Sequence, residues 1–372
     1  MHNITTRLQE YNIYKNYKLL FLLITLIINA GCNNCDCIDN NTPGVSYNNI
    51  YFTAKTLNDN LWYSFLYEDN NYTKIASNSE LFSTTSNNEK IAVLVHEKNT
   101  KSLVLRDLFG DTIGKEIAKS NIKNFGYPVL SSTGNQVLYN IDRDLYLWNY
   151  NSKTDAAYLE LLTSSFASNN TLPSFSYDGK YIAFVEADNN NKSLLKVAAS
   201  SATDNIIFSK DIEVPQTRVT EIQWMPNRNA FYFIMNDTAV YYYDLVEGEE
   251  LISFGNTTNL GVVYLDISSN KRYAVFVNLK NELWIKDIAS NGFYKILSNE
   301  ENSILRNPKL NYDSSKLILL YDDAANTVEL KNKTGNLYLL DLYFQNNIPK
   351  VINSTLIFNN VSTAYWGRYT KL

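Results

Sequence analysis

The sequence predicts an all-β protein, a β-propeller of seven four-stranded blades closed into a ring by its C-terminal strand. The first observation is a strand-like apolar run that returns along the chain, starting at residues 50, 91, 137, 181, 230, 273 and 317. Repeats of roughly 45 residues built from short strands are typical of propeller blades. The second observation is composition, since 28 Tyr and only 3 Met among 372 residues favour strands over helices.

The clearest repeat unit is "PSFSYDGKYIAFVEA", residues 173–187. Asp178 and Gly179 tolerate positive φ, so they predict a hairpin turn of type I′ between two strands. The run that begins at Tyr181 is β-branched and aromatic, which indicates a buried strand. Weaker versions of the same turn precede the other runs, at residues 86, 132, 225, 268 and 312.

A third strand follows most of these runs, at residues 102, 144, 239, 282 and 336. Several of these segments carry an aspartate after the apolar alternation: Asp107, Asp244, Asp287 and Asp341. Asp favours turns because its carboxylate accepts hydrogen bonds from nearby backbone N–H groups. We therefore expect these residues to start the turn into the outer strand, and we expect no catalytic role for them.

The two ends of the chain set the number of blades. The first unit opens at Ile50 directly with a second strand, and "VSTAYWGRY" from residue 361 aligns with "VTEIQWMPN", the first strand of an interior unit at residue 219. Together the two ends make one complete blade, which gives seven blades and leaves no open sheet edge in the ring. The alternative is six blades with a separate N-terminal hairpin unit.

The unit at residues 173–187, "PSFSYDGKYIAFV" followed by "SLLKV", resembles the WD40-like Pro-Asp-Gly repeat of TolB-type β-propellers. The other units share its periodicity and hydrophobic pattern. The resemblance implies a propeller that docks peptide and lipoprotein partners at the bacterial envelope. TolB-type proteins also carry an N-terminal α/β domain, and fewer than twenty residues separate Cys32 from the first predicted strand here, too few for such a domain.

The N-terminal residues 1–31 have the pattern of a lipoprotein signal peptide. Basic residues precede "LLFLLITLII", residues 19–28, an apolar stretch of signal-peptide length that is short for a membrane span. "NAGC" follows, with small residues before Cys32, although Asn29 stands where Leu is commonest in a lipobox. We expect Cys32 to be lipidated; the alternative is an ordinary secretory signal.

Residues 32–46 are polar and predict a flexible tether, and residues 47–372 predict the propeller. Cys35 and Cys37 are the remaining cysteines, and no second Cys or His cluster completes a tetrahedral metal site. A disulfide or free thiols are therefore favoured over a metal site, and we expect neither a metal nor a cofactor.

Catalytic signals are scarce in this sequence. The two histidines are His2, in the signal segment, and His96, at the end of a predicted strand, so a Ser-His-Asp triad has little to draw on. A formal charge of −5 without a long basic run argues against nucleic acid as a partner. The insertion at residues 321–335 favours a long surface turn, with a binding loop as the alternative.

These observations predict a monomeric, non-enzymatic propeller that is lipid-anchored outside the cytoplasm and binds envelope proteins or peptides. The alternative is a glycan-active lyase or hydrolase, because carboxylates from different blades can meet at the central channel without any sequence spacing to reveal them.

Overall fold

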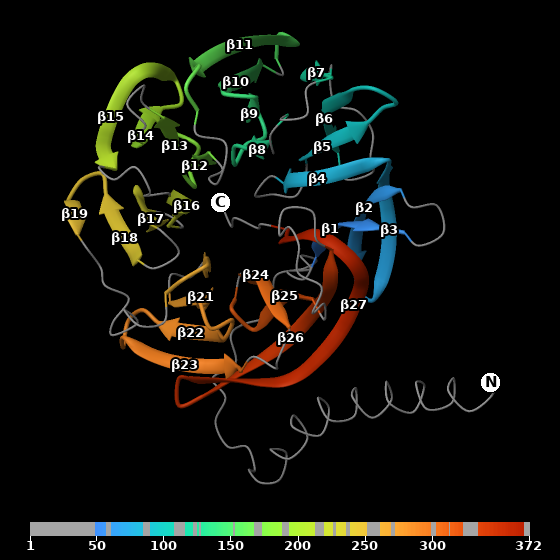
Figure 1. The fold of residues 1–372 in the computed structure, drawn as a ribbon, viewed down its shortest axis with the longest axis vertical. Helices are drawn as coiled ribbons and strands as arrows, with labels where there is room; N and C mark the ends of the chain where they lie inside the picture. Colours follow the sequence, from blue (N-terminus) through green and yellow to red (C-terminus); the bar gives the residue numbers. More distant parts are fainter. Residues whose placement is uncertain are drawn as a thin grey trace.

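The computed structural model describes these residues: 49–56, 61–84, 90–107, 116–121, 125, 128–151, 153–166, 173–187, 193–212, 219–225, 228–235, 239–250, 261–268, 272–298, 303–311, 313–322 and 334–367. The described residues form antiparallel sheets that are arranged as a ring (Figure 1). None of the described residues belongs to a helix that is long and apolar enough to cross a membrane.

Five four-stranded sheets follow one another around the ring, and we number them blades 2 to 6 in chain order. In each, the strand order in space equals the order in sequence, from the first, innermost strand to the last, outermost one (Figure 1). Blade 2 contains β4 (Ser79–Thr84), β5 (Lys90–His96), β6 (Lys101–Asp107) and β7 (Ala118–Ser120); blade 3, β8 (Val129–Leu130), β9 (Gln136–Ile141), β10 (Asp144–Asn151) and β11 (Ala156–Thr163); blade 4, β12 (Ser174–Phe175), β13 (Tyr181–Ala187), β14 (Ser193–Ala199) and β15 (Ala202–Ile212); blade 5, β16 (Val219–Trp224), β17 (Ala230–Met235), β18 (Ala239–Asp244) and β19 (Gly248–Glu250); and blade 6, β20 (Tyr264–Ile267), β21 (Tyr273–Val277), β22 (Leu283–Asp287) and β23 (Gly292–Leu297).

The two ends of the chain share a larger sheet, in which β27 belongs to two blades. Its order is β24 (Ile304–Leu310), β25 (Lys316–Asp322), β26 (Gly335–Gln345), β27 (Ile348–Trp366), β1 (Ile50–Lys55), β2 (Trp62–Glu68) and β3 (Asn71–Ser77). The first part of β27 pairs with β26 as the outer strand of blade 7, and residues 361–366 pair with β1 as the inner strand of blade 1. Trp366 lies opposite Ile50 in this pairing.

This pairing confirms the predicted seven-bladed ring closed by the C-terminal strand. The alternative of six blades with a separate N-terminal hairpin is wrong, because β1, β2 and β3 share one sheet with the end of β27.

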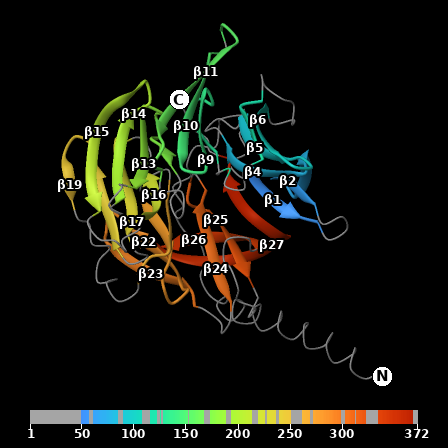
Figure 2. The same cartoon turned by 45° about the horizontal axis from the view of Figure 1, so that its top comes forward.

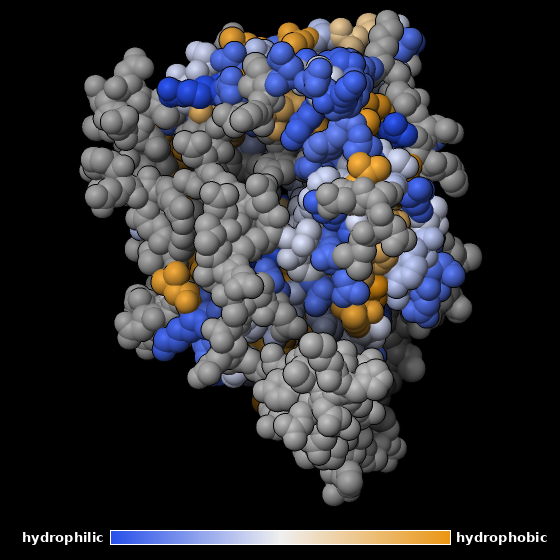
Figure 3. Space-filling model, turned by 45° about the vertical axis from the view of Figure 1, so that its right-hand side comes forward, coloured by the Kyte–Doolittle hydropathy of each residue, from blue (hydrophilic) through white to orange (hydrophobic). Residues whose placement is uncertain are grey.

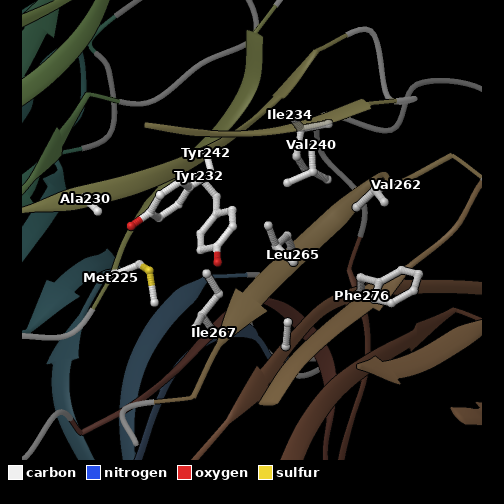
Figure 4. Packing of buried hydrophobic residues seen from close by; sticks show 11 residues of the cluster. Met225, Ala230, Tyr232, Ile234, Val240, Tyr242, Val262, Leu265, Ile267 and Phe276 are labelled. Carbon is white, nitrogen blue, oxygen red and sulfur yellow. The ribbon is translucent and has the colours of Figure 1, made fainter. Parts of the chain in front are cut away.

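The core of the ring lies between the blades. Among the described residues there are seven apolar clusters, one for each pair of neighbouring blades. Figure 4 shows the cluster between blades 5 and 6, where Tyr232 and Tyr242 face Leu265 and Ile267. Because neighbours cover both faces of each sheet, a second strand such as β21 is buried at every position and reads as an uninterrupted apolar run.

A recurring turn joins the inner strand of a blade to its second strand. The backbone N–H of the first turn residue donates to the carbonyl five residues on, at 2.8–3.0 Å, in five blades: Ser131, Ser176, Met225, Ser268 and Asn311. In blade 1 the two ends of the chain make the equivalent contact, where the Gly367 N–H donates to the carbonyl of Asn49 at 2.8 Å. In four of these turns the side-chain oxygen of the same residue accepts the N–H five residues on: Ser131, Ser176, Ser268 and Asn311. The repeated small polar residue therefore fixes the hairpin geometry.

The turn at Asp178 and Gly179 is not the predicted type I′. Only Gly179 has a positive φ, of 73°, and its N–H donates to the carbonyl of Ser176 at 2.9 Å. A type I′ turn joins its strands through two residues, whereas Phe175 pairs with Ile182 across a longer loop. The carboxylate of Asp178 accepts hydrogen bonds from the Ser176 hydroxyl (2.7 Å) and the Lys180 N–H (3.1 Å), which is a structural role.

The predicted turn role of the third-strand aspartates holds for two of them. Asp244 accepts the backbone N–H groups of the second and third residues after it, and Asp287 does the same. For Asp341 the prediction is wrong, since this residue lies inside the long strand β26 and binds Lys316 and Asn353 instead. Asp107 ends β6, and the turn that follows lies outside the described residues.

Candidate functional site

The inner strands surround the centre of the ring (Figure 1). Each of β4, β8, β12, β16, β20 and β24 is the last strand of its sheet on the central side, so one of its edges has no neighbouring strand. Backbone N–H groups along such an edge need other acceptors when they are buried. Side chains of the preceding blade supply some of them: the Ser83 hydroxyl of blade 2 accepts the N–H of Leu130 in blade 3, at 3.1 Å.

Three charged side chains from consecutive inner strands meet near the centre of the ring. The Lys309 ammonium of β24 lies 3.4 Å from a carboxylate oxygen of Asp266 in β20 and 3.6 Å from one of Glu221 in β16. The Lys309 and Asp266 side chains are mostly buried, and Glu221 retains a quarter of its exposure. This channel cluster, Glu221, Asp266 and Lys309, joins blades 5, 6 and 7 and carries two acidic groups for one basic group.

Both carboxylates of the channel cluster also bind strand edges. Glu221 accepts the N–H of Leu265 at 3.0 Å, and Asp266 accepts the N–H of Leu310 at 3.0 Å. Burial raises the pKa of Glu221, and the nearby Lys309 ammonium partly opposes this increase. A carboxylic acid with a raised pKa beside a second carboxylate is the arrangement used in general acid-base catalysis. Here, however, each carboxylate already uses one oxygen as an acceptor for the next blade.

Two tryptophans complete the contacts between inner strands. The Trp366 indole N–H donates to the carbonyl of Lys309 at 2.7 Å, and that of Trp224 donates to the carbonyl of Ser174 at 3.2 Å. Each tryptophan lies one residue before the recurring turn of its blade. The hydrogen bond that Trp224 makes from blade 5 to blade 4 is therefore repeated by Trp366 from blade 1 to blade 7. The sequence alignment of these two segments therefore corresponds to equivalent positions in space.

The residues singled out from the sequence do not converge on this cluster. Cys32 lies outside the described residues, as do Cys35, Cys37 and His2. His96 ends β5, where its Nε2 lies 2.8 Å from a carboxylate oxygen of Glu80 on the inner strand β4. Across the described ranges, no group of three or more His, Cys, Asp or Glu side chains is arranged to hold a metal ion.

The channel cluster was missed from the sequence although one signal was present. Asp266 and Lys309 each stand two residues before the first residue of the recurring turn, Ser268 and Asn311 respectively. Aligning the units on that turn places both at the same level of neighbouring inner strands. Glu221 has no such signal, because it stands four residues before its own turn residue, Met225.

A second candidate surface is the outer strand of blade 3. Tyr158, Leu159 and Leu161 of β11 are 62%, 52% and 53% exposed, respectively. On the face that Figure 3 presents, apolar side chains form small spots among hydrophilic ones, over the part of the chain that is described there. These three large apolar residues lie within four positions of one edge strand, whereas the exposed Ile348, Ile352 and Leu356 of β27 are spread over nine positions.

Two solved structures are similar to the chain in fold. Kluyvelomyces marxianus Hsv2 aligns with a TM-score of 0.51 and 10% sequence identity over 80% of this chain and 92% of its own. The β-propeller domain of Myceliophteria_thermophila Cps50 (Swd1) aligns with a TM-score of 0.52 and 12% identity over 69% of this chain and 87% of its own. No family model and no curated protein sequence matches the chain. The second of these structures is a β-propeller domain, which agrees with the blade topology of this chain.

Proposed function

We propose that the protein is a non-enzymatic binding propeller that is held at the bacterial envelope by a lipid on Cys32, as in a TolB-like scaffold. The observation that carries the proposal is that the two carboxylates of the channel cluster bind neighbouring blades to one another. Glu221 and Asp266 accept strand N–H groups and share Lys309, so they serve the joints between blades. Function then falls to the outer surface of the ring, where the exposed residues of β11 are available for contact.

The lipid anchor rests on the sequence "NAGC" after an apolar stretch of signal-peptide length. In this proposal residues 1–31 are removed, residues 32–46 form the tether and the propeller lies outside the cytoplasm. Metabolic labelling with a palmitate analogue should mark the wild-type protein, and Cys32→Ala should abolish the label and release the protein from membranes. Cys35→Ala is the matched control and should keep both. Labelling that persists in Cys32→Ala contradicts the anchor.

Binding is tested by capture from envelope extracts on the purified full chain. We expect a defined set of envelope proteins or peptides to be retained by the wild type and lost when the protein is heat-denatured. Retention of glycans on an array, with no protein retained, would contradict the binding proposal.

A glycan-active enzyme is the second candidate, and the channel cluster is the observation that favours it. Glu221, with its pKa raised by burial, is the group suited to donate a proton, and Asp266 is the nearby second carboxylate. Release of reducing ends from envelope polysaccharides that is abolished by Glu221→Gln, in a protein with an unchanged secondary structure, would support this candidate. Activity equal in the wild type and this variant would exclude these carboxylates as its catalytic pair.

A further inference from the structure

The outer strand of blade 3 differs from the outer strands that protect their edges with lysine. The strands β3, β23 and β27 carry Lys74, Lys295 and Lys350, respectively, which discourages pairing with another strand. β11 reads AAYLELLT, in which Glu160 is the one charged residue and no Lys, Arg or Pro is present. It is also the terminal strand of its sheet, so among the described residues no further strand pairs with its outer edge.

Both sides of β11 present apolar groups beside that edge. Leu159 lies opposite Trp148 on β10, and Leu161 lies opposite Tyr146, so these two leucines extend an aromatic row on the side that faces blade 2. Tyr158 points to the other side of the strand, because successive side chains alternate. A strand added along this edge would place alternate side chains against the leucines and against Tyr158.

Among the described residues, the outer strand of the neighbouring blade is much shorter than β11. The outer strand of blade 2, β7, is three residues long, whereas β11 has eight. The hairpin formed by β10 and β11 stands out beyond the adjoining strands in Figure 2. Eight residues of edge span about 26 Å, enough to pair with a complete short strand.

We propose that β11 binds an extended segment of a partner protein, which adds to blade 3 as a fifth strand with apolar side chains at alternate positions. The proposal rests on the proposed binding function and locates it. The exposed parts of Tyr158, Leu159 and Leu161 amount to on the order of 300 Å², if a large side chain exposes about 150 to 250 Å² in full.

The size of this surface decides between a peptide and a second copy of the chain. A stable protein interface buries about 800 Å² on each partner, and the three exposed apolar side chains of β11 supply less than half of that area. An added strand gains much of its affinity from backbone hydrogen bonds along the edge, and the side chains set its specificity. The available apolar area therefore fits a single extended segment.

The probe for this site is a fluorescein-labelled peptide with the sequence Lys-Thr-Val-Thr-Val-Thr-Val-Lys, titrated by fluorescence anisotropy into the full chain in detergent micelles. Its partner probe carries N-methyl groups on the valines and therefore has fewer N–H groups to donate to an edge. The edge variant combines Leu159→Lys and Leu161→Lys. The matched control is Val246→Lys, at a residue that is 84% exposed on blade 5.

We expect saturable binding of the unmodified peptide to the wild type and to Val246→Lys, and binding at least about tenfold weaker to the edge variant. The N-methylated peptide should also bind the wild type at least about tenfold more weakly. Melting curves confirm that each variant is folded, which the exposure of the substituted side chains favours.

Equal affinity of the peptide for the wild type and the edge variant would overturn the proposal, as would the absence of saturable binding at about 1 mM peptide. A concentration-dependent dimer that the edge variant abolishes would instead assign the edge to a second copy of the chain. Envelope proteins that are captured equally by the wild type and the edge variant would overturn this location and leave the proposed binding function intact.

Discussion

Replacing Trp366 by Ala should weaken the closure of the ring. Trp366 is 6% exposed, packs in the cluster between blades 7 and 1, and donates its indole N–H to the carbonyl of Lys309 at 2.7 Å. Truncating a buried Trp to Ala lowers the free energy of unfolding by about 3 to 5 kcal/mol, and because Trp366 also loses a hydrogen bond we expect a value near the upper end of that range. For a domain of this size the loss corresponds to a fall in Tm of about 2 °C per kcal/mol, or roughly 6 to 10 °C.

Differential scanning calorimetry of wild type and variant measures this effect, with guanidinium unfolding as a second readout. Trp366→Phe retains most of the apolar packing and loses the donor, so we expect a smaller destabilisation of about 1 to 2 kcal/mol. Trp62→Ala in the same blade is the control: Trp62 is only partly buried and should cost about 1 kcal/mol, mainly through its contact with Lys55. A Tm for Trp366→Ala within about 2 °C of wild type would refute this account of ring closure.

Three further predictions address the turns and the charges. Gly179→Val should lower the free energy of unfolding by about 1 to 3 kcal/mol, because φ is 73° and a Cβ would lie 3.3 Å from the Ser132 hydroxyl oxygen. Asp178→Asn should change the free energy of unfolding little, because Asn suits the same turn. A lower Tm for Asp178→Asn than for Gly179→Val would argue against a structural role of the turn. Burial raises the pKa of Glu221 above 4.5, so this residue contributes stability that is fully present below that pH and is lost as the pH rises through the pKa of the folded state. Glu221→Gln should remove this loss of stability with rising pH. If urea titrations give a difference between the variant and the wild type that does not vary with pH, the raised pKa of Glu221 is contradicted. For Asp244, burial favours a higher pKa, but hydrogen bonds from the backbone and from Arg228 outweigh burial and lower the pKa below 3.8. The free energy of unfolding of the wild type should therefore exceed that of Asp244→Asn by about 1 to 3 kcal/mol near neutral pH, and this difference should decline as the pH falls below about 4. A difference that is constant down to about pH 2 would contradict the lowered pKa.

The repeat pattern predicted the strands well because the two faces of each blade are covered. A second strand that is buried on both sides must be apolar throughout, so β5, β9, β13, β17, β21 and β25 are visible as uninterrupted runs. Outer strands lack this signal, since they are partly exposed and, in blades 2 to 6, vary in length from the three residues of β7 to the eleven of β15. The prediction for Asp341 failed for the same reason: β26 continues beyond the end that the repeat suggests, because the long strand β27 provides a partner for its additional residues.

Local sequence fixed the turn positions but not their type. Gly179 and its equivalent Gly134 both have positive φ, as their places in the repeat suggest, but the number of residues between the paired strand positions depends on the register of the sheet. The aspartates were assigned a turn role from local preference, which succeeds where the strand ends, as at Asp244 and Asp287.

By itself, the sequence determined the seven-bladed architecture and the closure by the C-terminal strand, because strand runs, turns and the two half-units at the ends are all local patterns with a regular spacing. Only the tertiary structure decided which charges meet and which edge is exposed. Glu221, Asp266 and Lys309 are separated by more than 40 residues from one to the next, and they come together because consecutive inner strands converge on one axis. Likewise, the exposure of Tyr158, Leu159 and Leu161 on β11 depends on what the rest of the ring covers, which no local pattern reveals.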